Sequence, residues 1–498
     1  MLTRRELVKY GAKAGAALAL WPGACAPKPP GPTGVWVNDV HSELNATRVA
    51  SITRPDSLPA LQRVVAQAKA SGRALSIAAG RHAMGGQQFG TDSVLLDVSG
   101  MDQVLSFDRD KGEIEAGAGI RWPELVQYLV DAQAREPQSW GILQKQTGAD
   151  RLSLGGALAA NAHGRGLRFK PIVADVAAFT LVDSQGAAIR CSREQNPELF
   201  RLAIGGYGLF GILASVRLRL GRRQKLERVV EIIESADLPE RFAGRINDGY
   251  LYGDFQFSTD FDSDDLLRKG VFSCYRPAGP SAQVPDRQTE LSRSDWAGLI
   301  CLGHTRRGEA FKKYADYYLS TSGQIYWSDT HQLSEYIDHY HLELSGCLGR
   351  LAGGTEMITE IYVPRQALPG FLEAIRGDVV DRKMNLIYGT IRLIEPDDES
   401  FLAWAREPFA CVIFNLHVGH DAAGLRKAEA DFQKLIDRGI ERRGSYYLTY
   451  HRWATRDQVV ACYPQFPEFL KLKKQHDPEE RFQSDWYRHY RKMFQDMI

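Results

Sequence analysis

The chain has 498 residues, which is enough for two or three domains, each with its own core. Its 62 Lys and Arg residues balance its 61 Asp and Glu residues, so no basic excess would attract nucleic acid, and we expect no nucleic-acid partner. Hydrophobic residues make up 44% of the chain and charged residues 25%, values that are typical of a folded globular protein.

Residues 1–26 have the pattern of an export signal. The segment TRRELVK precedes a weakly apolar run, GAKAGAALALW, and small residues and prolines follow. A run of about ten apolar residues is too short to cross a bilayer, which needs roughly 20. The paired Arg4 and Arg5 resemble a twin-arginine signal, which exports folded proteins. We expect an exported protein, periplasmic or in the cell envelope, with no transmembrane span after signal removal.

Two other interpretations of this end stay open. An uncleaved amphipathic start is the first alternative. A lipid anchor at Cys25 is weaker, because Pro22 stands where a lipoprotein signal normally has leucine. Residues 27–44 are rich in Pro and Gly and have the composition of a linker.

The predicted elements of residues 45–222 mix helices and strands. Apolar residues recur at helical spacing in SLPALQRVVAQAKAS (57–71), and the strand ALSIA follows. Short β-rich segments, SVLLDVS, QVLSFD and GEIEAGAG, then precede a second helix, RWPELVQYLVDAQA, with Pro123 near its first turn. VADVAAFTLVDSQGAAIRCS predicts a hairpin that turns at residues 184–186. This order indicates an α+β fold and not a regular βαβ alternation.

From about residue 223 the pattern changes to longer strands mixed with helices. GGTEMITEIYVPRQALPGFLEAIRG predicts a strand and then a helix, and NLIYGTIRLIEPDD and FACVIFNLHVGH predict two more strands of a sheet. We assign residues 45–222 to a first domain, 223–440 to a second, and 441–498 to a closing C-terminal segment.

The cysteines exclude several kinds of site. Seven are scattered along the chain, at positions 25, 191, 274, 301, 347, 411 and 462, without a CxxC pair. This spacing argues against a zinc or iron–sulfur site and against a dense disulfide framework, with at most one or two bridges. We therefore expect no metal site.

Three glycine-dense loops lie in the first domain: AAGRHAMGGQQFG (78–90), LSLGGALAANAHGRG (152–166) and AIGGYGLFGILASVRLRL (203–220). Glycine lets several backbone N–H groups point at a pyrophosphate without Cβ atoms in the way. None of the three is a GxGxxG loop that opens a helix after the first strand, so the Rossmann interpretation fails. One such loop is usually a turn, but three in one domain favour a bound phosphate-bearing ligand.

The loops resemble those of the FAD-binding domain of the vanillyl-alcohol oxidase and p-cresol methylhydroxylase (PCMH) family. The resemblance rests on GRHA (80–83), on GG (155–156) with HGRG (163–166), and on GGYG (205–208) with FGI (210–212). It implies FAD bound between two α+β subdomains, with its flavin ring at the junction with a substrate (cap) domain, which we expect to be an antiparallel sheet with flanking helices. The cofactor-binding residues that it implies are Ala79, Gly80, Arg81, His82, Ala83, Met84, Gly85, Gln87, Thr147, Gly155, Gly156, Asn161, Ala162, His163, Gly164, Gly211 and Ile212.

His82 is the candidate for a covalent bond to FAD. In alditol oxidases and cytokinin dehydrogenases, relatives within the family, the His of this loop is bonded to the flavin 8α carbon, and a neutral imidazole is a competent nucleophile. The alternative is a loop histidine that hydrogen-bonds phosphate or backbone. Ala83 replaces the usual Ser. The resemblance also implies that Asn161 and Ala162 line the N5 edge of the flavin and that His163 packs beside it.

The second domain resembles, more faintly, the cap and C-terminal region of aldonolactone and alditol oxidases. TEMITEIYVPRQAL, IYGTIRLIEPDD and DPEERFQSDWYRHY carry this resemblance. Two departures stand out. Thr390 occupies the place of a catalytic Glu, two residues before Arg392, and YHRWAT (450–455) replaces a tight His-Trp-Gly-Lys. We expect a pocket of related plan and altered chemistry.

Oxidation of an alcohol carbon requires hydride transfer to flavin N5 and a group that accepts the hydroxyl proton. Arg392 is the candidate cation that stabilises negative charge. Glu360 and His417, each on an otherwise apolar strand, are candidate bases, and His451 is expected near the flavin. For each of them the alternative is a surface or salt-bridged side chain.

The sequence thus predicts an FAD-dependent oxidoreductase that oxidises the C–OH of a small polar molecule, such as a sugar, alditol or lactone, with oxygen or another electron acceptor as its partner. One alternative is a dehydrogenase or reductase of an apolar substrate, similar to a cytokinin, sterol or lipid. The other is an electron-transfer or binding subunit without catalysis, against which the second, substrate-sized domain argues.

Overall fold

The computed structural model describes residues 34–498, except 149, 280, 335–344 and 350–352. The expected export signal, Cys25 and most of the expected linker lie outside these described residues. Residues 35–498 form a single compact unit, so the proposed domain boundaries stay predictions. Among the described helices, none has both the length and the apolar character that a membrane span requires.

The first half of the described chain contains a small parallel sheet. β3 (Ser51–Thr53) and β4 (Leu75–Ala78) flank β5 (Val94–Asp97), and both pair with it in parallel. Helix α1 (Leu58–Ala70) packs its apolar stripe against this sheet, as the helical spacing predicted. The strands β1 (Val35–Val37) and β2 (Thr47–Val49) form a short antiparallel pair before it.

A five-stranded antiparallel sheet follows, in the order β10-β9-β11-β7-β6. Its core is closed by three helices with buried apolar faces. The predicted turn at residues 184–186 lies between β9 and β10, which pair antiparallel, so the predicted hairpin is confirmed. The elements are β6 (Val104–Asp108), β7 (Glu113–Gly117), α2 (Trp122–Ala132), α3 (Leu154–Ala160), β9 (Val176–Val182), β10 (Ala188–Ser192), α4 (Pro197–Ala203) and β11 (Ile212–Arg219), with β8 (Trp140–Gly141) and β12 (Gly221–Arg222) paired separately.

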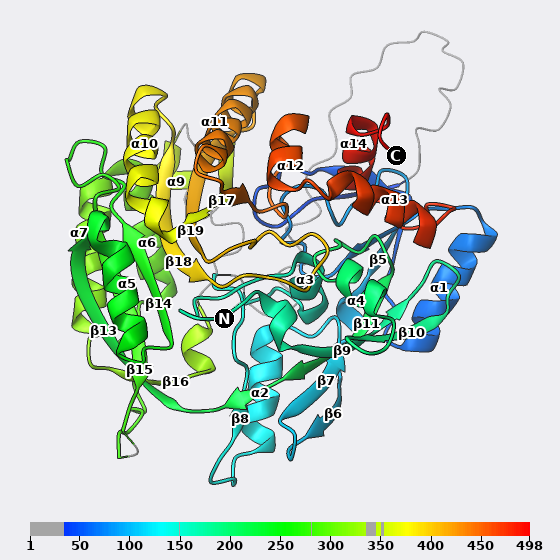
Figure 1. Cartoon of the computed structure of the whole chain (residues 1–498), viewed down its shortest axis with the longest axis horizontal. Coiled ribbons are helices and arrows are strands. Elements are labelled where there is room, and N and C mark those ends of the chain that lie inside the picture. The colour runs from blue at the N-terminus through cyan, green and yellow to red at the C-terminus, as the bar shows by residue number, and fades with distance from the viewer. Residues whose placement is uncertain (1–33, 149, 280, 335–344, 350–352) are drawn as a thin grey trace, which may run out of the picture. The chain divides into compact units, whose positions relative to one another are not determined.

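The second half is built on an eight-stranded antiparallel sheet in the order β16-β13-β15-β14-β18-β19-β17-β20 (Figure 1). This sheet with its flanking helices confirms the predicted α+β class and the sheet-based cap. Its strands are β13 (Lys225–Glu234), β14 (Tyr252–Phe257), β15 (Lys269–Pro277), β16 (Ile325–Trp327), β17 (Gly354–Pro364), β18 (Leu386–Ile394), β19 (Phe409–Gly419) and β20 (Ser445–Tyr446).

Helices cover the two faces of this sheet unequally. Helices α5 (Leu238–Asn247), α10 (Leu368–Asp381) and α11 (Ala422–Ile440) pack on one face, over apolar residues such as Met357 and Ile361. Because side chains alternate along a strand, the intervening residues point to the opposite face. There, α7 (Arg307–Ser320) packs against β13 and β15, and α6 (Arg293–Thr305) reaches across to β18. The rest of that face is left for the first half of the chain.

The C-terminal segment joins the two halves. After β20 it forms α12 (Arg456–Cys462), α13 (Phe466–His476) and α14 (Asp485–Met493). Leu75 of β4 donates its N–H to the carbonyl of Arg481 (2.7 Å) and accepts from the N–H of Gln483 (2.8 Å), so Phe482 extends the parallel sheet. A disulfide joins Cys301 of α6 to Cys347 of α9 (Ser345–Leu348), and Cys191, Cys274, Cys411 and Cys462 are free.

Candidate functional site

A cavity of about 960 Å³ lies between the glycine loops and the eight-stranded sheet. Its walls come from loop 79–88, from residues 146–148 and 150–163 including the start of α3, and from Gly208, Gly211 and Leu213. The opposite wall is the face of β14, β18, β19 and β17 that points away from α10 and α11. The three glycine loops, far apart in the sequence, therefore meet around one space.

Hydrogen bonds to the C-terminal segment hold the first glycine loop in place. Met84 donates its N–H to the carbonyl of Thr449 (3.1 Å), and the Gln87 amide donates to the carbonyl of Leu448 (2.7 Å). Gly80 is required by a close approach, because a Cβ there would lie 2.6 Å from the carbonyl oxygen of Arg151. The loop is thus a fixed wall whose backbone approaches neighbouring chain closely.

Most of the predicted cofactor-binding residues line this cavity. They are Ala79, Gly80, Arg81, His82, Ala83, Met84, Gln87, Thr147, Gly155, Gly156, Ala162, His163 and Gly211. Four predicted residues are not among the lining residues, namely Gly85, Asn161, Gly164 and Ile212. Ile212 instead belongs to the core under α1.

The Asn161 side chain hydrogen-bonds within the protein and does not line the cavity, where it was predicted to face the flavin edge. Its side-chain amide donates to Asp397 Oδ2 (2.7 Å), and its Oδ1 accepts from the N–H of Val173 (3.2 Å). The residue is fully buried, with the left-handed φ of 50° that ends α3. Asn161 therefore ties the glycine loop to the loop after β18, while its neighbour Ala162 faces the cavity.

His82 lies in the cavity wall as a neutral imidazole. Burial, followed by the nearby His41, Arg121 and Arg151, lowers the pKa of His82 to about 3. At neutral pH its ring therefore keeps an unprotonated nitrogen, which the covalent hypothesis requires. The bond itself stays a prediction.

Several buried polar atoms around the cavity fit a polar cofactor. Among the described residues, no hydrogen-bond partner exists for Gln88 Oε1, Gln146 Oε1, Thr147 Oγ1, Arg165 Nε or Arg392 Nε, and all five side chains line the cavity. Buried polar groups are normally paired, so these atoms call for a ligand with both donors and acceptors. FAD, with its phosphates, ribityl hydroxyls and flavin edge, meets this requirement.

The sheet side of the cavity is polar because of strand register. In β17 the residues Glu356 and Glu360 alternate with apolar residues that face α10 and α11. Across the sheet, Thr390 and Arg392 of β18 and Asn415 of β19 point the same way. A cavity face with this many polar groups is suited to orient a small polar molecule.

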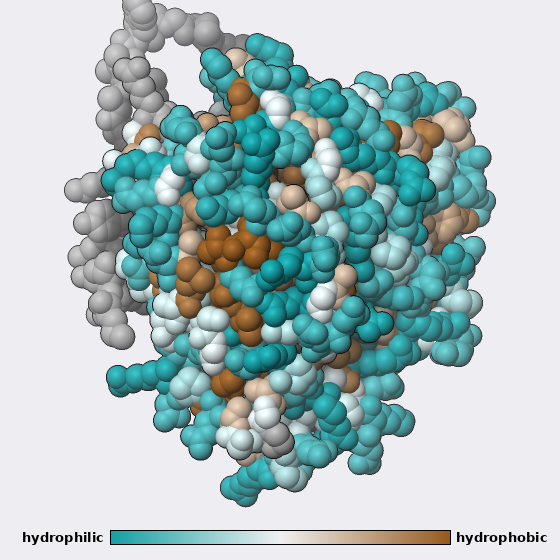
Figure 2. All heavy atoms as spheres, turned by 60° about the vertical axis from the view of Figure 1, so that its left-hand side comes forward, coloured by the Kyte–Doolittle hydropathy of each residue, from teal (hydrophilic) through white to brown (hydrophobic). Residues whose placement is uncertain are grey.

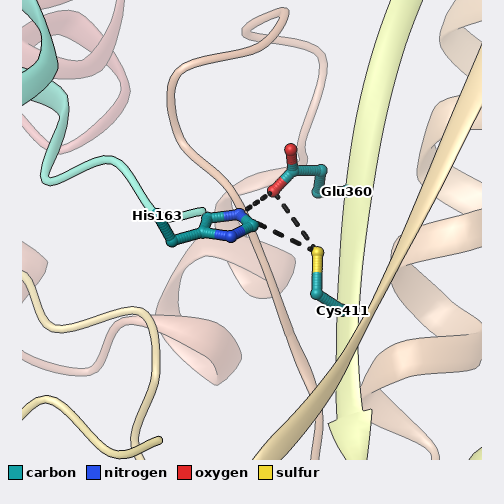
Figure 3. Close-up of side chains that lie close together, drawn as sticks. All are labelled: His163, Glu360 and Cys411. Atoms are coloured by element: carbon teal, nitrogen blue, oxygen red, sulfur yellow. Dashed lines mark hydrogen bonds and ion pairs between the residues drawn. The ribbon is translucent and has the colours of Figure 1, made fainter. Parts of the chain in front are cut away.

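Glu360 and His163 form the central pair of this face (Figure 3). His163 Nε2 lies 2.9 Å from Glu360 Oε2, and its Nδ1 lies 3.1 Å from the carbonyl oxygen of Gly164. A carbonyl only accepts, so Nδ1 carries a proton. Glu360 also accepts from the hydroxyls of Tyr362 (2.7 Å) and Tyr450 (2.6 Å).

These donors keep Glu360 ionised. Burial alone would raise the pKa of the carboxyl, but the positive charge of His163 and the hydrogen bonds from His163, Tyr450 and Tyr362 outweigh it and lower the pKa to about 2. Cys411 Sγ lies 3.6 Å from the same carboxylate, and burial raises the pKa of this thiol well above its usual range. Glu360 is therefore a carboxylate at neutral pH, and it lines the cavity together with His163 and Tyr450.

The other predicted catalytic residues separate into two groups. Arg392 lines the cavity and is 8% exposed, and its side chain has no hydrogen bond or ion pair to another described residue. His417 lies behind the wall, with Nδ1 3.2 Å from Glu356 Oε1. His451 is stacked on Trp453 with ring centroids 3.6 Å apart, away from the lining, and burial lowers its pKa to about 3. The structure brings Arg392 and Glu360 together and leaves both histidines outside.

Beyond the polar face the cavity continues into an aromatic and apolar lobe beneath α6 and α7. Its lining includes Trp296, Leu299, Phe311 and Tyr314. At its edge, the Arg228 guanidinium lies 4.6 Å from the ring centre of Tyr326, donates to Tyr275 Oη and has no carboxylate partner in the described part of the chain. Figure 2 views this side of the molecule, where apolar residues gather within a largely hydrophilic surface.

Sequence reasoning missed several of these residues. Glu356 could have been found, since it stands four residues before Glu360 in one strand and so shares its face. Tyr450 begins the segment YHRWAT, in which only His451 was predicted to lie near the flavin. Arg228 and Tyr314 gave no local signal, because only the packing of α7 on β13 brings them to the cavity.

Comparison with known proteins identifies the first half. A family model described as FAD binding domain matches residues 49–192. This chain is a flavoprotein with a PCMH-type FAD-binding domain. The L-gulono-1,4-lactone dehydrogenase of Mycobacterium tuberculosis (strain ATCC 25618 / H37Rv) is 25% identical over 474 residues, which cover 91% of this chain and 98% of that protein.

Plant enzymes match over shorter stretches. The mitochondrial L-galactono-1,4-lactone dehydrogenase of Brassica oleracea is 37% identical over 135 residues, or 27% of this chain and 21% of that protein. The match thus spans about a fifth of that relative's length. Cytokinin dehydrogenase 2 of Arabidopsis thaliana is 28% identical over 190 residues, or 37% of this chain and 36% of that protein. The similarity to both is confined to part of the flavoprotein.

Proposed function

We propose that this flavoprotein is an FAD-dependent oxidoreductase that oxidises a C–OH group of a small polar molecule, with a sugar lactone as the first substrate class to test. The observation that carries the proposal is one cavity in which the FAD-binding loops face a polar sheet, with the Arg392 side chain unpaired among the described residues. The similarity to lactone dehydrogenases, along most of the chain in the mycobacterial case, supports the substrate class.

The polar residues of the cavity have distinct roles in the proposed reaction. FAD, when bound, supplies the hydride acceptor. The Arg392 guanidinium stabilises negative charge on the substrate oxygen. The Tyr450 hydroxyl, which donates to Glu360 Oε1, lines the cavity beside the Glu360–His163 pair and offers the substrate a polar contact. The Glu360 carboxylate orients the Tyr450 hydroxyl by accepting its hydrogen bond. Because its pKa is low, Glu360 is only a weak proton acceptor.

Anaerobic reduction of the flavin tests the proposal. The purified protein is mixed with L-gulono-1,4-lactone, L-galactono-1,4-lactone, an alditol and a cytokinin, and the visible flavin band is followed. We expect bleaching by at least one lactone. Arg392→Met should slow this bleaching by about 10²–10³-fold, and Arg392→Lys by less. Equal rates in wild type and Arg392→Met would contradict the assigned role.

A substrate with an apolar part is the second candidate. The lobe lined by Trp296, Leu299 and Phe311 offers an apolar surface that a bare sugar lactone does not need. If the cytokinin, and no lactone, bleaches the flavin, this candidate replaces the first. A preparation without FAD would contradict both candidate substrates and favour a binding module.

We also propose that the protein is exported in a folded state, with oxygen or another electron acceptor as its oxidant. The twin-arginine pattern at Arg4 and Arg5 motivates the export proposal. The Cys301–Cys347 disulfide supports it, because disulfides persist in oxidising compartments such as the periplasm.

A further inference from the structure

A second cluster of ligand-type side chains lies beside the cavity, apart from the Glu360–His163 pair. His304 Nε2 of α6 lies 3.0 Å from Glu356 Oε1, and His417 Nδ1 of β19 lies 3.2 Å from the same oxygen. Ligand atoms of all three lie within 4.8 Å of one another. The two imidazole planes are nearly perpendicular, at 87°, with ring centres 5.1 Å apart.

Hydrogen bonds account for only part of this cluster, since His417 Nδ1 hydrogen-bonds to Glu356 Oε1 but His304 is left over. Neither ring nitrogen of the buried His304 has a hydrogen-bond partner among the described residues, although Nε2 is only 3.0 Å from a carboxylate oxygen. The Glu360–His163 pair is the internal comparison, since there both ring nitrogens have partners. Buried polar atoms are rarely left unpaired. His304 Nε2 lies at ion-pair distance from Glu356 without forming a hydrogen bond, a geometry that a metal ion between the two groups would explain.

Two imidazoles and one carboxylate are a donor set for a divalent transition metal. Zinc binds such ligands at about 2.0–2.2 Å, which places adjacent ligand atoms of a tetrahedral site roughly 3.3 Å apart. The two measured separations lie within a few tenths of an ångström of that value. The residues come from three elements, α6, β17 and β19, so packing and not a sequence motif assembles them.

We propose that His304, Glu356 and His417 bind one divalent transition-metal ion, of which Zn²⁺ is the probe. Three protein ligands leave at least one coordination position open. Glu356 is part of the cavity wall, and so is Gly303 next to His304, which puts the ion within reach of a water or a substrate oxygen. The scattered cysteines predicted no metal site. They gave no information on a site made of histidines. The proposal does not depend on the substrate class proposed above.

Metal binding by the tag-free holoprotein is the test. The protein is stripped with a chelator, equilibrated with Zn²⁺, dialysed and assayed for zinc by mass spectrometry, with the affinity taken from calorimetry. We expect one zinc per chain in wild type. His304→Ala, His417→Ala and Glu356→Gln should each weaken binding by more than about tenfold, since even indirect contacts are worth 10–100-fold.

His476→Ala is the matched control, because His476 on α13 pairs with Glu198 at the surface and should leave zinc binding unchanged. Retained flavin absorbance shows that each variant is folded. The proposal is overturned if wild type binds no stoichiometric zinc, or if the three variants bind zinc as His476→Ala does. In either case the residues form a His–Glu–His cluster without metal.

X-ray absorption of the zinc-loaded wild type keeps the proposal testable if a variant fails to fold. We expect two imidazole ligands with oxygen completing the shell. Sulfur ligands, or a shell of oxygen alone, would place the zinc elsewhere on the protein and overturn the assignment.

Discussion

At Glu360 three side chains donate hydrogen bonds to one buried carboxylate, and its folded-state pKa is about 2 against an ordinary 4.5. A depressed pKa contributes stability that is present above the unfolded-state value and is lost as pH falls through the folded-state value. A gap of about two and a half units corresponds to about 3 kcal/mol. We therefore expect Glu360→Gln to lose about 3 kcal/mol at pH 7, as measured by denaturant unfolding.

The difference between wild type and Glu360→Gln should be constant above about pH 4.5 and shrink as the pH approaches about 2. Glu373→Gln is the control, because Glu373 pairs with Arg268 at the surface, with half of its side chain exposed, and should change stability by less than about 1 kcal/mol. A loss for Glu360→Gln that stays the same at pH 7 and pH 3 would show that shape and not charge is responsible.

Acid denaturation tests whether His82 is bonded covalently to the flavin. If it is bonded to the flavin, acid-denatured protein stays yellow, and the coloured peptide contains residues 78–90 of the first glycine loop. His82→Ala should still bind FAD, because glycines such as Gly80 and Gly155 let the backbone approach the pyrophosphate without the imidazole. It should release FAD on denaturation and turn over more slowly. Release of FAD from denatured wild type would reduce His82 to a non-covalent contact.

Among the elements, α6 links the cavity to the disulfide. It carries Cys301, bonded to Cys347 across 46 positions, and three residues later it presents His304. Closing a loop of this length restricts the unfolded chain by up to about 4 kcal/mol. Cys301→Ser should therefore lower the melting temperature, and Cys347→Ser should lower it equally.

The double variant Cys301→Ser/Cys347→Ser completes the disulfide experiment. Since both single variants remove the same bond, the double variant should melt at nearly the same temperature as either one. If the two effects add in full, the side chains matter individually and the bridge is absent in solution.

The elements also show what the sequence could predict. The strand TEMITEIYVP was recognisable from its residues, and β17 spans Gly354–Pro364. Alternation then places Glu356 and Glu360 on one face, which the sequence alone predicts. Alternation alone does not say which face of the sheet lines the cavity. That depends on α10 and α11 packing against Met357 and Ile361, a contact between elements.

At the scale of the whole molecule, the glycine loops were predictable because a phosphate-bearing cofactor constrains the local backbone. The substrate side was less predictable, because its contacts are long-range. His163 meets Glu360 across 197 positions, and Tyr450 reaches the same carboxylate from the C-terminal segment. Such partners carry no spacing signal. His451 and His417 were chosen by residue type, and packing placed both outside the cavity.

Export concerns the whole folded protein and gives the last prediction. Arg4 and Arg5, whose pairing motivates the export proposal, lie outside the described part of the chain. Replacing both by Lys keeps the charge but removes the paired guanidinium groups that the twin-arginine signal is named for. The variant should remain in the cytoplasm, folded and yellow, because every residue that lines the cavity comes after position 40 in the sequence.

Fractionation of cells that make wild type or the Arg4→Lys/Arg5→Lys variant measures this. The control is Lys9→Arg, which keeps the charge and leaves the pair intact, and it should be exported like wild type. The Cys301–Cys347 bridge gives an independent readout, since it should be reduced in the retained variant and oxidised in the exported protein. Unchanged export of the double-lysine variant would show that another signal directs the chain, whatever its activity.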